Sequence, residues 1–202
     1  MNATRDRRSR SPPASIPADA LCVDRWRRAG WIGYQQFLVG EPPWLWLTRT
    51  GLAAYHLASY NPAPPAISRL HHIHAVNTVR FHLEDERRSW ISERAIRAGR
   101  YPTPQMERDT RHIPDGILRT PAGDICIEVE LTQKKPDELF HKMAAVMFAS
   151  DPRTHHSAYA GIWYDTPDPR IKKALEAARE AHARDRYVGR RAGIVKIFLV
   201  EL

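Results

Sequence analysis

The fold is decided by the stretch Ile113-Pro114-Asp115-Gly116-Ile117-Leu118 and by Asp124-Ile125-Cys126-Ile127-Glu128-Val129-Glu130-Leu131-Thr132, which follows it. In residues 124–132, apolar side chains alternate with polar ones, which is the two-residue period of a β-strand. Glu128 and Glu130 therefore point to the same face. The turn-forming residues between the two stretches predict a hairpin, which places Asp115 at the start of the first strand, near the level of Glu128.

Three carboxylates in this arrangement are suited to a hard divalent cation. Mg²⁺ prefers carboxylate oxygens from a few side chains together with water. Beside a phosphate, such an ion activates water and neutralises charge that builds up in the transition state. The alternative is an ordinary solvated sheet face, the commoner place for alternating acids. Because Glu128 and Glu130 repel each other, they require a cation or a lysine nearby, and Lys134 and Lys135 follow directly.

The composition favours a folded chain with an anionic partner. The 202 residues include 43% hydrophobic residues and six Trp, enough for one or two domains with a core. A net charge of +8 favours nucleic acid or another anionic surface as the partner. Cys22 and Cys126 have neither disulfide nor metal-ligand spacing, so we expect reduced thiols and a cytoplasmic location. No apolar run has membrane-spanning length and no signal-peptide core is found, so we expect no membrane partner.

The first 18 residues combine arginines with Ser-Pro-Pro and are typical of a disordered basic arm. Residues 19–30 follow as a short helix that ends at Gly30 and carries three more arginines. We expect these arginines to contact DNA phosphates from the arm and from the helix: Arg5, Arg7, Arg8, Arg10, Arg25, Arg27 and Arg28.

Residues 19–60 have the element order of the C-terminal part of a winged helix-turn-helix. Two strand-like runs, 31–39 and 44–48, are joined by a Gly-Glu-Pro-Pro turn. Thr48 then caps a helix that reaches about Ala58, with two side chains expected to face inward, Leu52 and Tyr55. A complete winged helix needs two more helices upstream, so we expect a truncated winged-helix unit. The alternative is a small hairpin packed on the main domain.

Residues 66–202 predict an α/β domain after a Pro-rich linker. A long helix over 66–87 carries the apolar stripe Leu70, Ile73, Val76, Val79 and Leu83. Its histidines, His71, His72 and His74, lack zinc-ligand partners at a suitable spacing and favour a solvated or phosphate-facing surface. Ser92 is expected to cap a helix, and residues 99–113 are expected to form a loop.

The remainder alternates helices and strands after the hairpin. Pro136 begins a helix to about Ala149 with an apolar face formed by Leu139, Met143 and Val146. A strand over 159–164, a helix that opens at Thr166-Pro167 and a final strand over 194–201 complete the pattern. This order predicts a mixed central sheet with helices on its faces.

Several motifs resemble the replication-relaxation family of plasmids and other bacterial mobile elements, which has a PD-(D/E)XK nuclease-like core. They are Trp46 to Leu52, Leu70-His71-His72 with Val76 to Arg80, Trp90 to Arg94, His112 to Gly116 and Ile127 to Lys134. The resemblance implies a winged-helix part followed by a restriction-endonuclease-like αβββαβ core. It also implies action on the DNA of a mobile element, in its replication or relaxation.

The resemblance further implies roles for the acids. Asp115 and Glu128 would hold Mg²⁺ or Mn²⁺, Glu130 would be a third ligand or position the water, and Glu93 would be an outer-shell acid. The superfamily has a lysine two residues after the second-strand acid, where this chain has Glu130. Lys134 is the candidate replacement, although a regular strand would start it roughly 13 Å beyond Glu130. Lys135 and a basic residue of the following helix remain open.

Three hypotheses follow. The first is a metal-dependent endodeoxyribonuclease acting on double-stranded DNA. The second is a non-catalytic DNA-binding factor that keeps the nuclease-like core as a scaffold. The third is an interaction module for replication or transfer proteins, or for a second copy of the chain, with Trp44 and Trp46 as an exposed contact patch.

Overall fold

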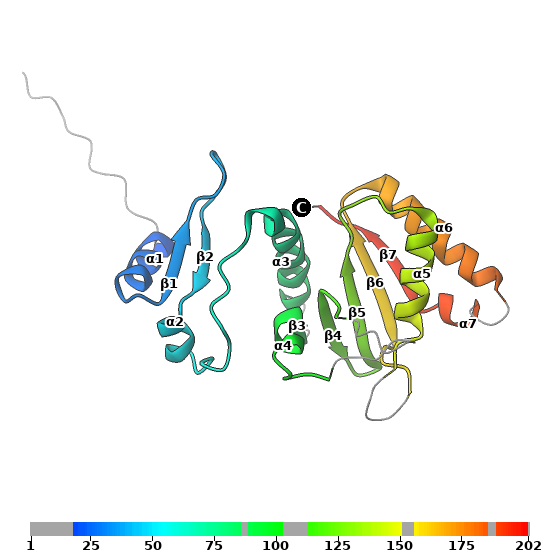
Figure 1. Ribbon diagram of the computed structural model, residues 1–202, viewed down its shortest axis with the longest axis horizontal. Coiled ribbons are helices and arrows are strands. Elements are labelled where there is room, and N and C mark those ends of the chain that lie inside the picture. The colour runs from blue at the N-terminus through cyan, green and yellow to red at the C-terminus, as the bar shows by residue number, and fades with distance from the viewer. Residues whose placement is uncertain (1–17, 86–88, 103–112, 151–155, 186–188, 202) are drawn as a thin grey trace, which may run out of the picture. The chain divides into compact units, whose positions relative to one another are not determined.

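The computed structural model describes residues 18–85, 89–102, 113–150, 156–185 and 189–201 (Figure 1). The chain divides into two compact units, Met1–Ile67 and Ser68–Leu202. Within the described ranges, no helix is both long and apolar enough to cross a membrane.

The first unit is a small hairpin between two helices. Helix α1 (Ala18–Arg28) is followed by antiparallel strands β1 (Ile32–Gln35) and β2 (Trp44–Leu47) and by α2 (Arg49–Ala54). Gly30 has a φ of 69°, and the amide of Trp31 donates to the carbonyl of Trp26. This left-handed glycine ends α1, as the sequence predicted.

The helix that follows the hairpin is shorter than expected. Thr48 caps α2 by accepting a hydrogen bond from the amide of Gly51 at 3.1 Å. The helix ends at Ala54 rather than near Ala58, because His56 adopts a positive φ of 57° that a helix cannot continue through. Leu52 is buried as expected, but the inward placement of Tyr55 was wrong, since Tyr55 is 49% exposed.

The prediction of an exposed aromatic patch on β2 was also wrong. Trp44 and Trp46 are both half-buried rather than exposed. Trp46 lies so close to Gly33 of the paired strand that a Cβ on this glycine would meet the indole ring at 2.2 Å. The two tryptophans are therefore partly used in packing the hairpin, which weakens the hypothesis of a contact patch.

The second unit is a five-stranded mixed sheet flanked by helices, as predicted. The strands are β3 (Ser89–Ser92), β4 (Gly116–Thr120), β5 (Gly123–Val129), β6 (Gly161–Thr166) and β7 (Val195–Leu199), and they pair in that order. The first three strands are mutually antiparallel, and β5, β6 and β7 are parallel. The helices are α3 (Leu70–Asp85), α4 (Glu93–Arg97), α5 (Pro136–Met147), α6 (Pro169–Arg184) and α7 (Gly189–Ala192).

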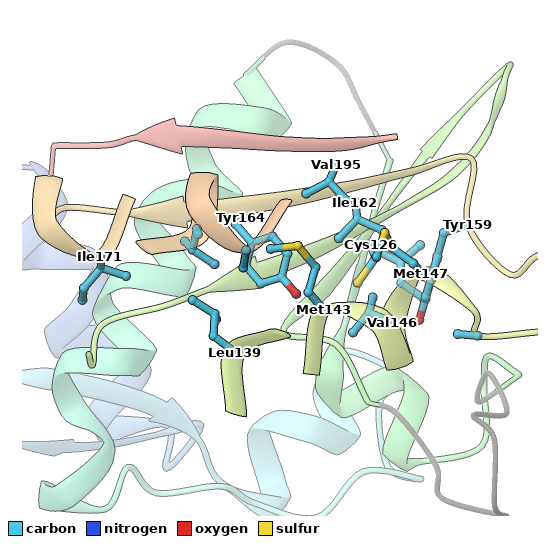
Figure 2. Close-up of a cluster of buried hydrophobic side chains, with 14 of the residues drawn as sticks. Cys126, Leu139, Met143, Val146, Met147, Tyr159, Ile162, Tyr164, Ile171 and Val195 are labelled. Atoms are coloured by element: carbon cyan, nitrogen blue, oxygen red, sulfur yellow. The ribbon is translucent and has the colours of Figure 1, made fainter. Parts of the chain in front are cut away.

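The helices cover both faces of this sheet. Helix α3 lies on one face, and α5 and α6 lie on the other (Figure 1). Under α3, Val79 and Leu83 pack against Leu118, Ile127 and Val129. On the other face, Leu139 and Met143 of α5 meet Ile162 and Tyr164 of β6 (Figure 2). Strand β5 contributes to both layers because its successive side chains point to opposite faces of the sheet. Its side chains on the α3 face are apolar, whereas Cys126 and Glu128 are buried on the face covered by α5.

Several boundaries differ from the sequence prediction. Strand β5 ends at Val129 rather than near Thr132, β6 begins at Gly161, and α6 begins at Pro169 with Asp168 as its cap. Strand β3 and the short α7 were not assigned from the residues. Most of the predicted loop over 99–113 lies outside the described residues. Ser92 caps α4 as predicted, accepting from the amide of Ala95 at 3.2 Å.

The packing under α5 gives a direct stability prediction. Met143 is fully buried between α5 and β6, so Met143→Ala should lower the free energy of unfolding by about 2–5 kcal/mol through lost contacts and a residual cavity. Lys173→Ala, at an exposed position of α6, should change it by less than about 0.5 kcal/mol. Urea denaturation followed by circular dichroism measures both, and equal effects of the two substitutions would contradict this packing.

Candidate functional site

The β4–β5 hairpin brings Asp115 and Glu128 together. Gly116 pairs with Ile127, so Asp115, one residue earlier, lies opposite Glu128 on the adjacent strand. The Oδ2 atom of Asp115 accepts a hydrogen bond from the amide of Val129 at 2.9 Å. The predicted meeting of these two acids at one level of the hairpin is confirmed.

Glu128 and Glu130 are buried, so the alternative of a solvated sheet face was wrong. Each is 5% exposed. Glu128 lies on the α5 side of β5, where the thiol of Cys126 is 3.8 Å from its Oε1 atom. Glu130 follows the last residue of β5, and its amide donates to the carbonyl of Asp165 at 2.9 Å. Buried acids of this kind need nearby cations.

Lys142 of α5 supplies positive charge to both glutamates. Its Nζ atom is 3.0 Å from Oε2 of Glu128 and 3.7 Å from Oε2 of Glu130. Burial lowers the pKa of Lys142, but the hydrogen bond and the charge of Glu128, with Glu130 and Asp115, outweigh it and raise the pKa above its ordinary value. Lys142 therefore stays an ammonium at neutral pH beside the acidic group.

Sequence reasoning left the replacement lysine open and did not identify Lys142. Its position could have been found from the helix period. It follows the buried Leu139 by three residues and precedes the buried Val146 by four, so it borders the face that α5 turns to the sheet. A basic residue at that border can reach across to an acid on the sheet.

Lys134 lies nearer to the acids than predicted. It forms an ion pair with Glu130. The expected separation along an extended strand was wrong, because β5 ends at Val129 and the chain turns before Lys134. The Thr132 hydroxyl also donates to Oε1 of Glu130 at 3.1 Å. Glu130 is thus held by Lys134, Lys142 and Thr132.

His72 of α3 contacts Asp115, which sequence reasoning missed. Its Nε2 atom is 2.8 Å from Oδ1 of Asp115. This hydrogen bond raises the pKa of His72 above its ordinary value, against the opposing effect of burial. The expected solvated histidine face therefore holds only for His71 and His74, which are exposed.

Glu93, the predicted outer-shell acid, contacts the site through its main chain. Its amide is 3.4 Å from the carbonyl of Asp115. Its carboxylate pairs with Arg97 at 2.7 Å and with Arg69 at 3.4 Å. Glu93 thus joins α4 to the segment before α3, with Asp115 beside it.

The predicted DNA-contacting arginines of the first unit fall into two groups. Arg5, Arg7, Arg8 and Arg10 lie outside the described residues. The exposed arginines of α1 are Arg25, Arg27 and Arg28. Arg28 forms an ion pair with Asp24, and the Arg27 guanidinium lies 4.5 Å from the centre of the Tyr34 ring. These three side chains present positive charge on one helix.

The donor chemistry fits a divalent ion at two of the three acids. Among the described residues, no group of three or more His, Cys, Asp or Glu side chains is placed to hold a metal. Mg²⁺ is commonly held by one or two carboxylates together with water and substrate phosphate. Asp115 and Glu128 match that requirement as oxygen donors on adjacent strands. Glu130 matches it less well, because it is paired with a second lysine, Lys134, in addition to Lys142.

No protein-family model matches the chain, and no curated protein or solved structure shows significant similarity to it.

The ion pair between Lys142 and Glu128 gives a prediction for stability. Lys142→Met should destabilise the protein by about 1–3 kcal/mol at pH 7, because it leaves the buried Glu128 carboxylate without its ammonium partner. Glu128→Gln in the same chain should restore part of that loss. The pKa of Lys142 is raised above its ordinary value of 10.5, so its stabilising contribution is fully present at any pH below that value. The effect should therefore be equal at pH 7 and pH 9.

A double-mutant cycle by urea denaturation measures this coupling. The matched substitution Lys173→Met, on an exposed stretch of α6, should show no coupling to Glu128→Gln. Additive effects of Lys142→Met and Glu128→Gln would show that the two side chains do not interact.

Proposed function

We propose that this protein binds DNA and that its second unit cleaves the phosphodiester backbone with Mg²⁺ or Mn²⁺. One observation carries the proposal: Asp115 and Glu128 occupy facing positions across the β4–β5 hairpin, and the Lys142 ammonium lies 3.0 Å from Glu128. Acid, acid and lysine are the groups of the PD-(D/E)XK nucleases that the sequence resembles. In this chain the lysine comes from α5, and Glu130 stands at its usual position.

Asp115 and Glu128 would hold the ion. When bound, it would polarise a phosphate oxygen and lower the pKa of a water molecule. The Val129 amide and His72 both hydrogen-bond to Asp115 and hold its carboxylate toward the hairpin. With a cation shared between the acids, the Lys142 ammonium can turn to a phosphate oxygen and stabilise the negative charge that develops there.

The remaining acids support this group. Glu130 forms an ion pair with Lys134, so Lys134 offsets part of the negative charge of the acidic group and is the second lysine able to approach a phosphate. The Glu93 amide joins the start of α4 to the Asp115 carbonyl, and the Glu93 carboxylate pairs with Arg97 and Arg69. In this proposal, Glu130 and Glu93 would be positioning residues.

DNA binding is supported by charge. The chain has a net charge of +8, and Arg25, Arg27 and Arg28 are exposed on α1. The first unit, a hairpin between two helices, would act as a partial winged helix on double-stranded DNA. The process would be replication or relaxation of a plasmid or other mobile element in the cytoplasm, with replication or transfer proteins or a second copy as partners.

Plasmid cleavage tests the catalytic proposal. With Mg²⁺ or Mn²⁺, the wild-type protein should nick or linearise supercoiled plasmid, and Asp115→Asn, Glu128→Gln and Lys142→Met should each slow this by at least about 100-fold. Glu138→Gln and Lys173→Met, at exposed positions, should stay within about twofold of wild type. Full activity in both Asp115→Asn and Glu128→Gln would rule out this site.

A second candidate function is DNA binding without cleavage. It is favoured by the pairing of each acid with protein groups: Asp115 with His72 and Val129, Glu128 with Lys142, and Glu130 with Lys134. Such pairing makes the site self-sufficient as a scaffold. A protein that shifts DNA in a gel-shift assay but does not cleave it with Mg²⁺ or with Mn²⁺ would support this function over the first.

Salt dependence tests the DNA-binding part of both functions. The logarithm of the DNA association constant should fall linearly with the logarithm of salt concentration, because bound phosphates release counterions. Replacing Arg25, Arg27 and Arg28 by Ala should reduce the slope by about 0.9 for each phosphate contact that is lost. Lys173→Ala is the matched control, and an unchanged slope in the triple variant would exclude α1 from the interface.

A further inference from the structure

A pocket lies on the face of the second unit's sheet opposite Glu128. Helix α3, strand β6 and the end of β7 surround a space of about 600 Å³. Its walls include Val79, Leu83, Trp163, Asp165, Phe198 and Glu201. This volume lies within the range of pockets that hold small organic ligands. None of the residues proposed for DNA cleavage lines this pocket.

Asp165 is the unusual member of this wall. It is 5% exposed, and its Oδ2 atom is buried with no hydrogen-bond partner among the residues that the structure describes. At the same level of the sheet, the neighbouring strands present Val129 and Phe198, which offer no side-chain donor. Burial raises the pKa of Asp165 to about 7. A buried carboxylate oxygen without a donor is rare in native proteins, and it points to a ligand that supplies one.

The rest of the pocket indicates what that ligand carries. Trp163 and Phe198 meet edge to face, with ring centres 5.3 Å apart, and provide aromatic surface beside Asp165. Glu201 adds a second acid. Aromatic faces and carboxylates together attract organic cations and repel phosphates.

We propose that this pocket binds an organic cation, a guanidinium, amidinium or amine carried on a flat or apolar body, through a charge-assisted hydrogen bond to Asp165. The aromatic and aliphatic walls take up the body, and the carboxylate fixes the charged end. Two kinds of ligand carry such a cation: a free small molecule and an arginine side chain of a polypeptide.

Calorimetric titration of the full chain tests this assignment. Benzamidine, a flat amidinium, should bind at least about tenfold more tightly than its neutral analogue benzamide, and Asp165→Asn should remove that preference. Glu138→Gln should keep it. Equal affinities for the two compounds, unchanged binding in Asp165→Asn, or tighter binding of guanosine than of benzamidine would overturn the proposal.

Two further ligands identify the source of the cation. An arginine-containing peptide that binds at least about tenfold more tightly than acetylarginine amide indicates a polypeptide, since it uses contacts beyond the side chain. Equal affinities indicate a small molecule. Either result supports the pocket, whereas failure of both ligands and of benzamidine to bind overturns it.

A stability measurement separates the proposal from a structural role of Asp165. The pKa of Asp165 is raised in the folded state. Ionisation of its carboxyl group therefore lowers the free energy of unfolding of the wild type progressively as pH rises from about 4 through 7. Asp165→Asn should therefore melt at a higher temperature than wild type at pH 8. Among the described residues, the other titratable groups in the pocket wall are His82 of α3 and Glu201, and Lys196 lies 5.8 Å from the Trp163 ring. The comparison is therefore repeated in His82→Gln. A lower melting temperature for Asp165→Asn would mean that its carboxylate already has a partner, and would overturn the proposal.

Discussion

The folding of the second unit depends on neutralising the negative charge that its β4–β5 hairpin buries. Strand β5 places Glu128 under α5, and Glu130 follows just beyond the strand's end, with Asp115 opposite Glu128 on the adjacent strand. Left alone, these carboxylates would repel one another and lose hydration. Lys142 offsets this from α5, and Lys134 offsets it from the segment after the strand. The docking of α5 on the sheet and the charge balance of the site are therefore one constraint.

This charge balance bears on the proposed function. A cluster of acids and lysines at the junction of a hairpin and a helix is costly for stability alone, since well-packed apolar residues would serve there as well. The same groups are useful where a divalent ion and a phosphate must be held together. His72 and the Val129 amide hydrogen-bond to Asp115, and Lys142 pairs with Glu128, so the protein itself fixes the positions of both acids.

The sequence predicted the parts of this site that depend on local pattern. The alternation over β5 and the turn before it were enough to place Asp115 level with Glu128. Lys142 and His72 could not be placed this way, because their contacts depend on how α5 and α3 pack against the sheet. The end of β5 at Val129 was missed for a related reason: the alternation continues through Leu131, while the chain turns away. Strand β3 has only Trp90 and Ile91 as apolar residues, too short a pattern to identify without its partner β4. The pocket around Asp165 combines three elements far apart in sequence and left no local signal.

Manganese binding followed by electron paramagnetic resonance tests the central claim most directly, since it reports the ion without requiring catalysis. One ion should bind to each wild-type chain, and Asp115→Asn and Glu128→Gln should each abolish that binding, while Glu138→Gln leaves it intact. Wild-type protein that binds no ion, or binding that persists in both acid variants, would contradict the assignment of these two carboxylates as a metal site.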